Sequence, residues 1–272
     1  MKKLLIVALI LYASSIFAEN LTARHIKYYA PIKIERSWSN YNPGKINFNI
    51  TSPETQGAKI YRKIVTDPDK YITDNARRVL QTLYFSPADS IPNIDTINYI
   101  VHSFDGISYK SGNGNSVRID YSTDWIEKSF IGNDTLKLDY ETRGVIYHEL
   151  THAFQLEPQG CGEYDGKSPY WAFIEGMADG VRVACGCFEQ DFNSIDRPRG
   201  GSWMNGYRTL GYFLYWMQLN KDKDFIKKFN ATALHVVPWS FDGAIKHIFG
   251  DKPENTIENF WNEYQIAVGD KK

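Results

Sequence analysis

Gly144-Val-Ile-Tyr-His-Glu-Leu-Thr-His-Ala-Phe154 contains an H-E-x-x-H pattern at residues 148–152. Its apolar residues follow a helical spacing, which predicts a helix over residues 142–156. On a helix, residues four apart lie on one face, so His148 and His152 can reach the same metal ion. Glu149 is turned about 100° from His148 by the helix pitch and lies beside the metal without binding it. A base that takes a proton from metal-bound water needs this position.

A catalytic zinc usually has three protein ligands and one open position for water, so a third ligand is required. The extended pattern with a third histidine fails, because Gln155 and Pro158 occupy its glycine and histidine positions. A second predicted helix, over residues 170–185, carries Glu175 and Asp179, which are four apart and face the same way. We expect Glu175 to be the third ligand and Asp179 to accept the free ring N–H of a ligating histidine.

Both motifs also have ordinary structural explanations. The histidines could belong to a packed helix, and Glu175 and Asp179 to a solvated face with Arg182 as an ion-pair partner. The residues around the two carboxylates are too apolar for a solvated face, however, and buried carboxylates require a partner such as a cation. We expect Gly176 to let the two motif helices approach closely. Together the segments predict one zinc ion per chain.

The rest of the chain predicts an α+β architecture. The 272 residues are 43% hydrophobic and contain no internal repeat, which favours one globular domain. In residues 45–130 strand signals dominate, with strands over 96–102 and 115–121 and one helix over 72–83. After Leu138 we expect helices over residues 142–156, 170–185, 204–219, 224–235 and 256–267. The formal net charge of -1 excludes a strong field that attracts nucleic acid or anionic lipid.

The first eighteen residues have the layout of a secretory signal peptide. Two lysines precede an apolar run over residues 4–11, and the small residue Ala18 suits a processing enzyme. Residues 4–18 are fewer than the roughly 20 that a bilayer span needs. We therefore expect cleavage near Ala18 and a secreted or periplasmic domain of residues 19–272 that is not held in a membrane.

Three cysteines, Cys161, Cys185 and Cys187, lie near the second motif. Their spacing matches no common zinc-cysteine pattern. One disulfide with one thiol left over is the ordinary expectation for an exported protein, so we expect Cys161 to bond to Cys185 or Cys187.

The chain resembles the plant and bacterial basic secretory proteins, a family that is grouped with the zinc peptidases by inference. The likeness lies in residues 144–155 and 174–182, in Gly206-Tyr207 before an aromatic helix and, more loosely, in residues 105–109 and 117–126. It spans about residues 61–264. The resemblance implies a zincin-like fold of the glutamate-ligand type, with a small mixed sheet above the metal helix and a helical lower lobe. It also implies that zinc is bound by His148, His152 and Glu175, with Glu149 as the base. This chain is not basic, so an attraction to acidic polymers does not carry over.

The expected reaction is hydrolysis of a peptide bond in a peptide or protein substrate, with Glu149 as the general base. Tyr207 is the expected donor to the negative charge that develops on oxygen, and His235 is its rival. An extended substrate would add as a strand to residues 115–121, which we expect at the sheet edge. The glycine-rich residues 159–166 form either a rim loop or a plain surface connection.

Two other functions fit the same residues. A zinc amidase that cleaves cell-wall amides would use the same three metal ligands and the same base. A substrate screen would separate it from a peptidase. A secreted defence or binding protein could hold a structural zinc, although such a site has no need of Glu149 as a base. We expect a monomer with no nucleic-acid partner.

Overall fold

The computed structural model describes residues 30–130 and 134–272, so the expected signal peptide lies outside the described residues. The secondary structure elements are β1 (Lys45–Ile50), α2 (Gln56–Ile64), α3 (Pro68–Leu83), β2 (Thr96–His102), β3 (Ser108–Asn113), β4 (Ser116–Ser122), α4 (Thr123–Ser129), α5 (Thr135–Phe154), α6 (Pro169–Ala184), the 3-10 helix η1 (Trp203–Asn205), α7 (Tyr207–Asn220), α8 (Phe225–His235), α9 (Phe241–Phe249) and α10 (Ile257–Ala267). All four strands of the described chain precede α5, and helices follow it. The α+β prediction with a small mixed sheet is confirmed.

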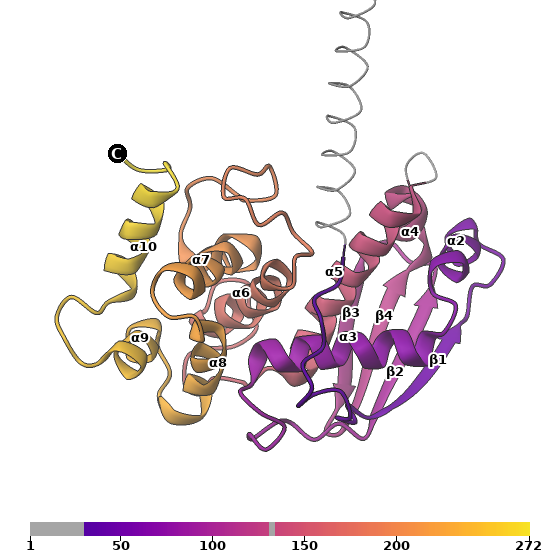
Figure 1. Cartoon of the computed structure of the whole chain (residues 1–272), viewed down its shortest axis with the longest axis horizontal. Helices are drawn as coiled ribbons and strands as arrows, with labels where there is room; N and C mark the ends of the chain where they lie inside the picture. Colours follow the sequence, from indigo (N-terminus) through magenta and orange to yellow (C-terminus); the bar gives the residue numbers. More distant parts are fainter. Residues whose placement is uncertain (1–29, 131–133) are drawn as a thin grey trace, which may run out of the picture.

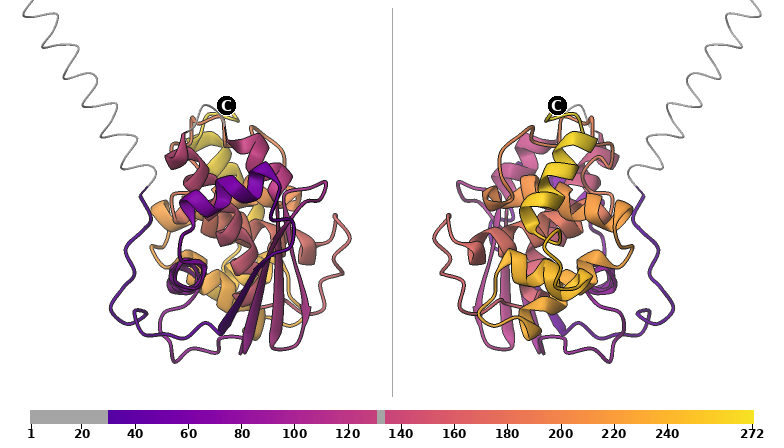
Figure 2. Two further views of the ribbon diagram at one scale, coloured as in Figure 1. Left: turned by 90° about the vertical axis from the view of Figure 1, so that its right-hand side faces the viewer. Right: turned by 90° about the vertical axis from the view of Figure 1, so that its left-hand side faces the viewer.

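The sheet has the strand order β1-β2-β4-β3. Strands β1, β2 and β4 are parallel, and β3 runs antiparallel to β4. Alternate residues of β2, which are Ile97, Tyr99 and Val101, are fully buried, because one face of the sheet is covered by helices. Figure 1 shows the sheet and α6–α10 on opposite sides of α5, and the two views of Figure 2 show each half in turn from the front.

Helix α5 forms the junction between the halves and packs against α3, α6 and β3. It begins at Thr135, earlier than the predicted start at residue 142, because the side chain of Asp134 accepts a hydrogen bond from the backbone N–H of Lys137 at 3.0 Å. Leu138, Ile146, Leu150 and Phe154 are buried along its length. The metal motif therefore lies on the last two turns of a long, buried helix.

The predicted strands and most predicted helices are present, with ends shifted by a few residues. The expectation of one helix in the first half is wrong, because α2 and α4 are present there as well. Both are short and begin at hydroxyl caps, Thr55 and Ser122, which accept backbone N–H groups. Strands β1 and β3 and helix α9 were also not predicted.

The predicted sheet edge is wrong. Strand β4, which covers the expected edge strand over residues 115–121, lies inside the sheet between β2 and β3. The edge next to α5 is β3 instead, since Ser108–Asn113 pairs only with β4. The order of strands depends on long-range pairing, which local alternation of apolar residues does not reveal.

The predicted disulfide is absent, because Cys161, Cys185 and Cys187 are all free and buried. The carbonyl of Cys161 accepts the backbone N–H of Tyr170 at the start of α6, whereas Cys185 caps the end of that helix. Sixteen helical residues separate the two ends by about 24 Å. A disulfide requires Cα atoms closer than about 7 Å, so Cys161 cannot reach Cys185. Cys187 lies beside Arg143 of α5, near that same far end.

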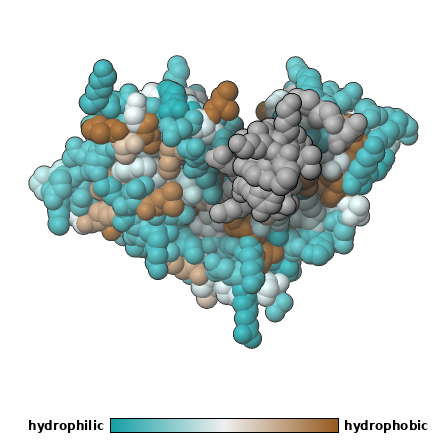
Figure 3. All heavy atoms as spheres, turned by 45° about the horizontal axis from the view of Figure 1, so that its top comes forward, coloured by the Kyte–Doolittle hydropathy of each residue, from teal (hydrophilic) through white to brown (hydrophobic). Residues whose placement is uncertain are grey.

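Figure 3 shows a face that is mostly hydrophilic, with apolar residues scattered over it. The buried apolar side chains form one cluster that runs from Trp38 to Tyr264. Within residues 30–130 and 134–272, no helix combines the length and apolar character that a membrane span requires.

Helices α6 and α7 approach each other most closely at glycines. A Cβ atom on Gly211 would lie 2.8 Å from the backbone carbon of Asp179 and 2.8 Å from the backbone nitrogen of Gly180. Gly176 was expected at the contact between the two motif helices, but it faces Leu210 of α7 instead. The motif helices approach at Gly144, whose position is covered by the guanidinium of Arg182. The close backbone contact at Gly211 of α7 therefore holds the backbone of Asp179 in place.

Replacement of Gly211 by alanine should destabilise the fold by about 1–3 kcal/mol, because the added methyl group meets backbone rather than a movable side chain. Chemical denaturation followed by circular dichroism measures the loss. The matched control is Gly180→Ala, whose Cβ would meet the side chain of Leu214 at 3.3 Å and should cost much less. A Gly211→Ala protein as stable as the parent would contradict this packing.

Candidate metal centre

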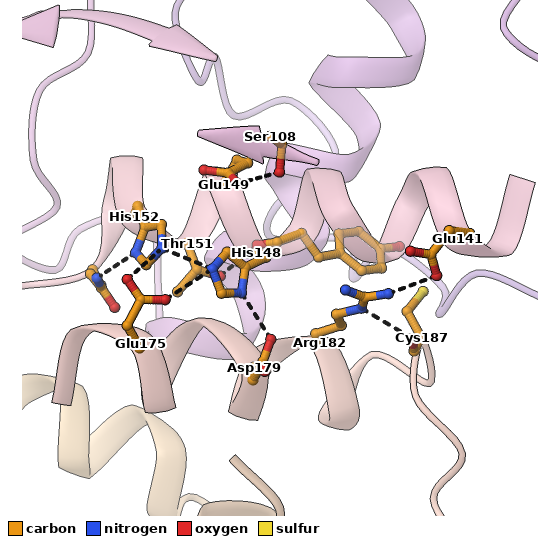
Figure 4. Close-up of polar contacts among 12 residues, drawn as sticks. Ser108, Glu141, His148, Glu149, Thr151, His152, Glu175, Asp179, Arg182 and Cys187 are labelled. Carbon is orange, nitrogen blue, oxygen red and sulfur yellow. Dashed lines mark hydrogen bonds and ion pairs between the residues drawn. The ribbon is translucent and has the colours of Figure 1, made fainter. Parts of the chain in front are cut away.

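Two helices bring the candidate ligands together. Helix α5 supplies His148 and His152, and α6 supplies Glu175, whose carboxylate is 2% exposed. Figure 4 shows the two imidazole rings and the carboxylate pointing toward one another from facing helices. One ligand atom from each of the three residues lies within 4.8 Å of the others. The group predicted from spacing is therefore assembled in space.

The distances between donor atoms fit a small tetrahedral cation. The two Nε2 atoms of His148 and His152 are 3.0 Å apart, and Glu175 oxygens lie 3.2 Å from His148 Nε2 and 3.7 Å from His152 Nε2. Ligands bound at about 2.0–2.1 Å with tetrahedral angles are separated by about 3.3 Å, which falls within this range. Glu175 Oε2 is buried with no hydrogen-bond partner. A cation would satisfy it and the two facing nitrogen lone pairs.

The two histidines of this group differ in protonation. Burial lowers the pKa of His148, but the nearby carboxylates of Asp179 and Glu175 outweigh it and raise the pKa to about 10. Burial, together with the neighbouring His148, lowers the pKa of His152 to about 3. Burial raises the pKa of Glu175, but the two histidines overcome it and lower the pKa to about 2. A metal ion that binds these donors competes with protons for the same nitrogen and oxygen atoms, so its affinity depends on pH.

A further shell of side chains orients the ligands. Asp179 Oδ1 lies 2.8 Å from His148 Nδ1, so it accepts that N–H and directs the Nε2 lone pair toward the centre. Gln155 Nε2 lies 3.0 Å from His152 Nδ1, and Gln155 Oε1 is buried without a hydrogen-bond partner. If His152 binds a metal through Nε2, its Nδ1 carries a proton, and the Gln155 amide in its other orientation accepts that N–H through Oε1. Both candidate rings thus have a side chain beside Nδ1.

Glu149 lies beside this group and does not belong to it. The hydroxyl of Ser108, on β3, donates to Glu149 Oε1 at 2.5 Å. Burial raises the pKa of Glu149, which is 4% exposed. Both residues line a cavity of about 410 Å³ together with His148, His152 and Glu175. A buried carboxylate with an elevated pKa next to a metal site is suited to taking and returning a proton.

Two exposed tyrosines, Tyr164 and Tyr207, also line this cavity. Tyr207 stacks on His148, with ring centroids 6.0 Å apart and planes at 8°. Tyr207 is the first residue of α7, and the residue before it, Gly206, is the N-cap with a φ of 58°. Tyr207 itself has a positive φ of 39°, which is an unusual backbone conformation for a tyrosine. Burial and the nearby Glu175 raise the pKa of Tyr207 to about 12, so its hydroxyl keeps its proton. The hydroxyl of Tyr164, from the glycine-rich loop, donates to Glu175 Oε1.

The rival donor His235 is not part of the site. It ends α8, stacks on His247 with centroids 5.4 Å apart and does not line the cavity. Ser108, Gln155 and Tyr164 were missed from the sequence. Gln155 lies one helical turn after His152, which is a usable signal, whereas Ser108 reaches Glu149 only through the fold.

The Asp179→Asn substitution should weaken binding of a divalent cation by about 10–100-fold. The amide can still accept the His148 N–H but carries no negative charge, so the ring becomes a poorer ligand. Competition with a metal-binding dye measures the affinity. Asp105→Asn changes an exposed carboxylate on a turn and serves as the control. Equal affinities for Asp179→Asn and the parent chain would contradict the role of Asp179.

Residues 43–264 match the profile of a protein family, BSP, described as "Peptidase of plants and bacteria". This match covers most of the chain and includes all the residues of the candidate centre. Searches of curated proteins and of solved structures gave no significant match.

Proposed function

This chain belongs to the BSP family of peptidases of plants and bacteria, and from that premise we propose that it is a zinc-dependent peptidase with a zincin-like fold. His148, His152 and Glu175 would hold one zinc ion. The observation that carries the proposal is the convergence of these three donors beside a buried Glu149 on one cavity. Two imidazoles and one carboxylate are a common ligand set of hydrolytic zinc, and the base has no purpose in a structural site.

A zinc ion at this centre would supply the Lewis acidity that activates water and polarises the peptide carbonyl. Glu149 takes the proton from the attacking water. Its Oε1 is held by Ser108, so we assign the transferred proton to Oε2. Glu149 then returns this proton to the leaving amine nitrogen, which needs it to depart as a neutral amine. The elevated pKa of the buried carboxyl helps it to hold the proton between these two steps.

Tyr207 is the proposed donor to the oxygen on which negative charge develops. Its hydroxyl stays protonated, and its ring stacks on His148 and lines the cavity. We expect Tyr207→Phe to lower kcat about 10²–10³-fold with the metal content unchanged, because a transition-state hydrogen bond is lost while the three ligands stay in place. Steady-state kinetics and metal analysis measure both quantities. Tyr41→Phe and His235→Ala are the controls, and an unchanged kcat for Tyr207→Phe would contradict the assignment.

The free edge of β3 is the proposed place for an extended substrate. The N–H of Ser122 donates to the carbonyl of Ile107 at 2.9 Å, next to the paired residues Ser108 and Tyr121. Hydrogen-bonded pairs alternate along antiparallel strands, so the backbone groups of Ser108 and Lys110 point away from β4. Both residues line the cavity. A substrate strand can pair with them and lay its carbonyl near the metal centre.

Export and chain organisation are also part of the proposal. We propose a secreted or periplasmic monomer, released by cleavage near Ala18, with residues 19–272 as one domain. The continuous core supports the single domain, and the lysine-led apolar start of the sequence supports export. The partner is a peptide or protein substrate, with neither nucleic acid nor membrane involved.

Metal analysis and casein digestion of residues 19–272 test the function. We expect about one zinc per chain, loss of casein cleavage with a strong chelator and recovery when zinc, but not magnesium, is added back. Casein cleavage that persists in protein shown to be metal-free would sink the proposal. A panel of cell-wall amides assayed in parallel separates a peptidase from an amidase.

A further inference from the structure

Two cavities meet at the metal centre. The first, of about 410 Å³, extends past His152 to Glu157 and Tyr170. The second, of about 730 Å³, extends the other way to Glu141, Arg182 and Phe188. Both are lined by the residues at the centre: Ser108, His148, Glu149 and Tyr207. The reacting position therefore lies between two spaces, each in the size range of a binding pocket for a ligand of several residues.

The cavities follow the direction of α5. Figure 4 shows His152 and Glu175 toward one end of this helix and Glu141 and Arg182 toward the other, with His148 between them. At 1.5 Å per helical residue, Glu141 lies about 10 Å before His148, and His152 lies about 6 Å after it. An extended chain rises about 3.3 Å per residue. This stretch of α5 thus spans about three substrate residues on one side of the centre and about two on the other.

Two arginines line the larger cavity, Arg182 and Arg208, and Arg182 is already paired. Arg182 Nη2 lies 3.0 Å from Glu141 Oε2, and its guanidinium lies 3.9 Å from the ring centroid of Phe188. Arg182 would have to leave both Glu141 and Phe188 to bind a substrate carboxylate. Arg208 is exposed, and its guanidinium lies 5.7 Å from the same ring centroid of Phe188.

We propose that this chain is an endopeptidase, whose substrate passes through both cavities and is cleaved at an internal bond. The inference rests on the proposed peptidase function and specifies its substrate as a continuous chain bound on both sides of the scissile bond. Phe188 contacts substrate residues on one side of that bond, and Tyr170 contacts those on the other.

Peptides with blocked ends test the proposal directly. The zinc-loaded protein is incubated with decapeptides that are N-acetylated and C-amidated, and with the same peptides with free ends, and the products are identified by mass spectrometry. We expect internal cleavage of both sets, at rates that agree within about twofold. A loss of more than about tenfold on blocking either end, or products shortened one residue at a time, would overturn the proposal. Zinc-loaded protein that cleaves neither set nor casein would instead remove the peptidase function itself.

Variants in the two cavities give a second readout. Phe188→Ala and Tyr170→Ala should each lower kcat/KM for blocked peptides by about 3–10-fold, because each removes one aromatic contact. In a peptide library, the two variants should change residue preference on opposite sides of the cleaved bond. Phe188→Leu keeps the packing against Arg182 if the alanine variant folds poorly. Phe85→Ala, an exposed phenylalanine that lines neither cavity, is the matched control. Changes confined to one side of the bond would contradict a two-sided site.

Discussion

The Glu149→Gln protein should keep its zinc and lose about 10³-fold in kcat. General bases contribute about 10²–10⁴-fold to enzymatic rates, and no other carboxylate in the described cavity is free to replace this one. Glu175 is engaged with both histidines and Tyr164, and Glu157 lies beyond His152. Glutamine has nearly the same shape and can still accept the hydrogen bond of Ser108, so the ligands should stay in place.

The measurement pairs zinc content with hydrolysis of casein and of a fluorogenic peptide. Glu127→Gln makes the same chemical change on the exposed surface of α4 and should match the parent in both assays. If Glu149→Gln were as active as the parent, Glu149 would not be the base. If Glu149→Gln lost its zinc together with its activity, Glu149 would instead be a ligand of the zinc.

The Glu175→Ala protein should lose both zinc and activity. Removal of one of three ligands leaves two imidazoles, and we expect the zinc affinity to fall by more than about 100-fold. Replacing a residue that only hydrogen-bonds to a ligand already lowers metal affinity by about 10–100-fold. The readout that separates a ligand from a packing residue is the stabilisation by zinc. A bound metal raises the unfolding free energy by RT ln(1 + [L]/Kd), so the parent should show a higher Tm with zinc and the variant should not.

Glu163→Ala is the matched control for this experiment, because it removes an exposed carboxylate from the loop before α6. It should retain the zinc-dependent rise in Tm. A Glu175→Ala protein that binds zinc as tightly as the parent would show that the ion is held elsewhere, and the proposed centre would be wrong.

The sequence is most informative where function depends on helical spacing. His148 and His152 are one turn apart on α5, and Glu175 and Asp179 are one turn apart on α6, so their spacing alone places each pair on one helix face. The contact between the pairs follows from chemistry, because buried carboxylates need a partner. In the fold, Asp179 lies 2.8 Å from His148 and Glu175 lies 3.2 Å from it.

Sequence reasoning fails where the answer depends on long-range geometry. The alternating residues of β4 look like an edge strand, but β3 covers that edge. Ser108 is 41 positions from Glu149, and no local pattern connects them. Cys161 and Cys185 look like partners because both flank the second motif, although they lie at opposite ends of α6. Each of these points is decided by three-dimensional geometry, which local sequence patterns do not contain.

The three separate thiols have a practical consequence for making the protein. With no covalent cross-link to form between them, correct folding needs neither an oxidising compartment nor a disulfide isomerase. Burial raises the pKa of all three thiols, to about 12 for Cys185 and about 11 for Cys187, which disfavours a reactive thiolate near neutral pH. Residues 19–272 can therefore be produced in the reducing cytoplasm of a bacterial host, and handled without a reductant that would compete for zinc.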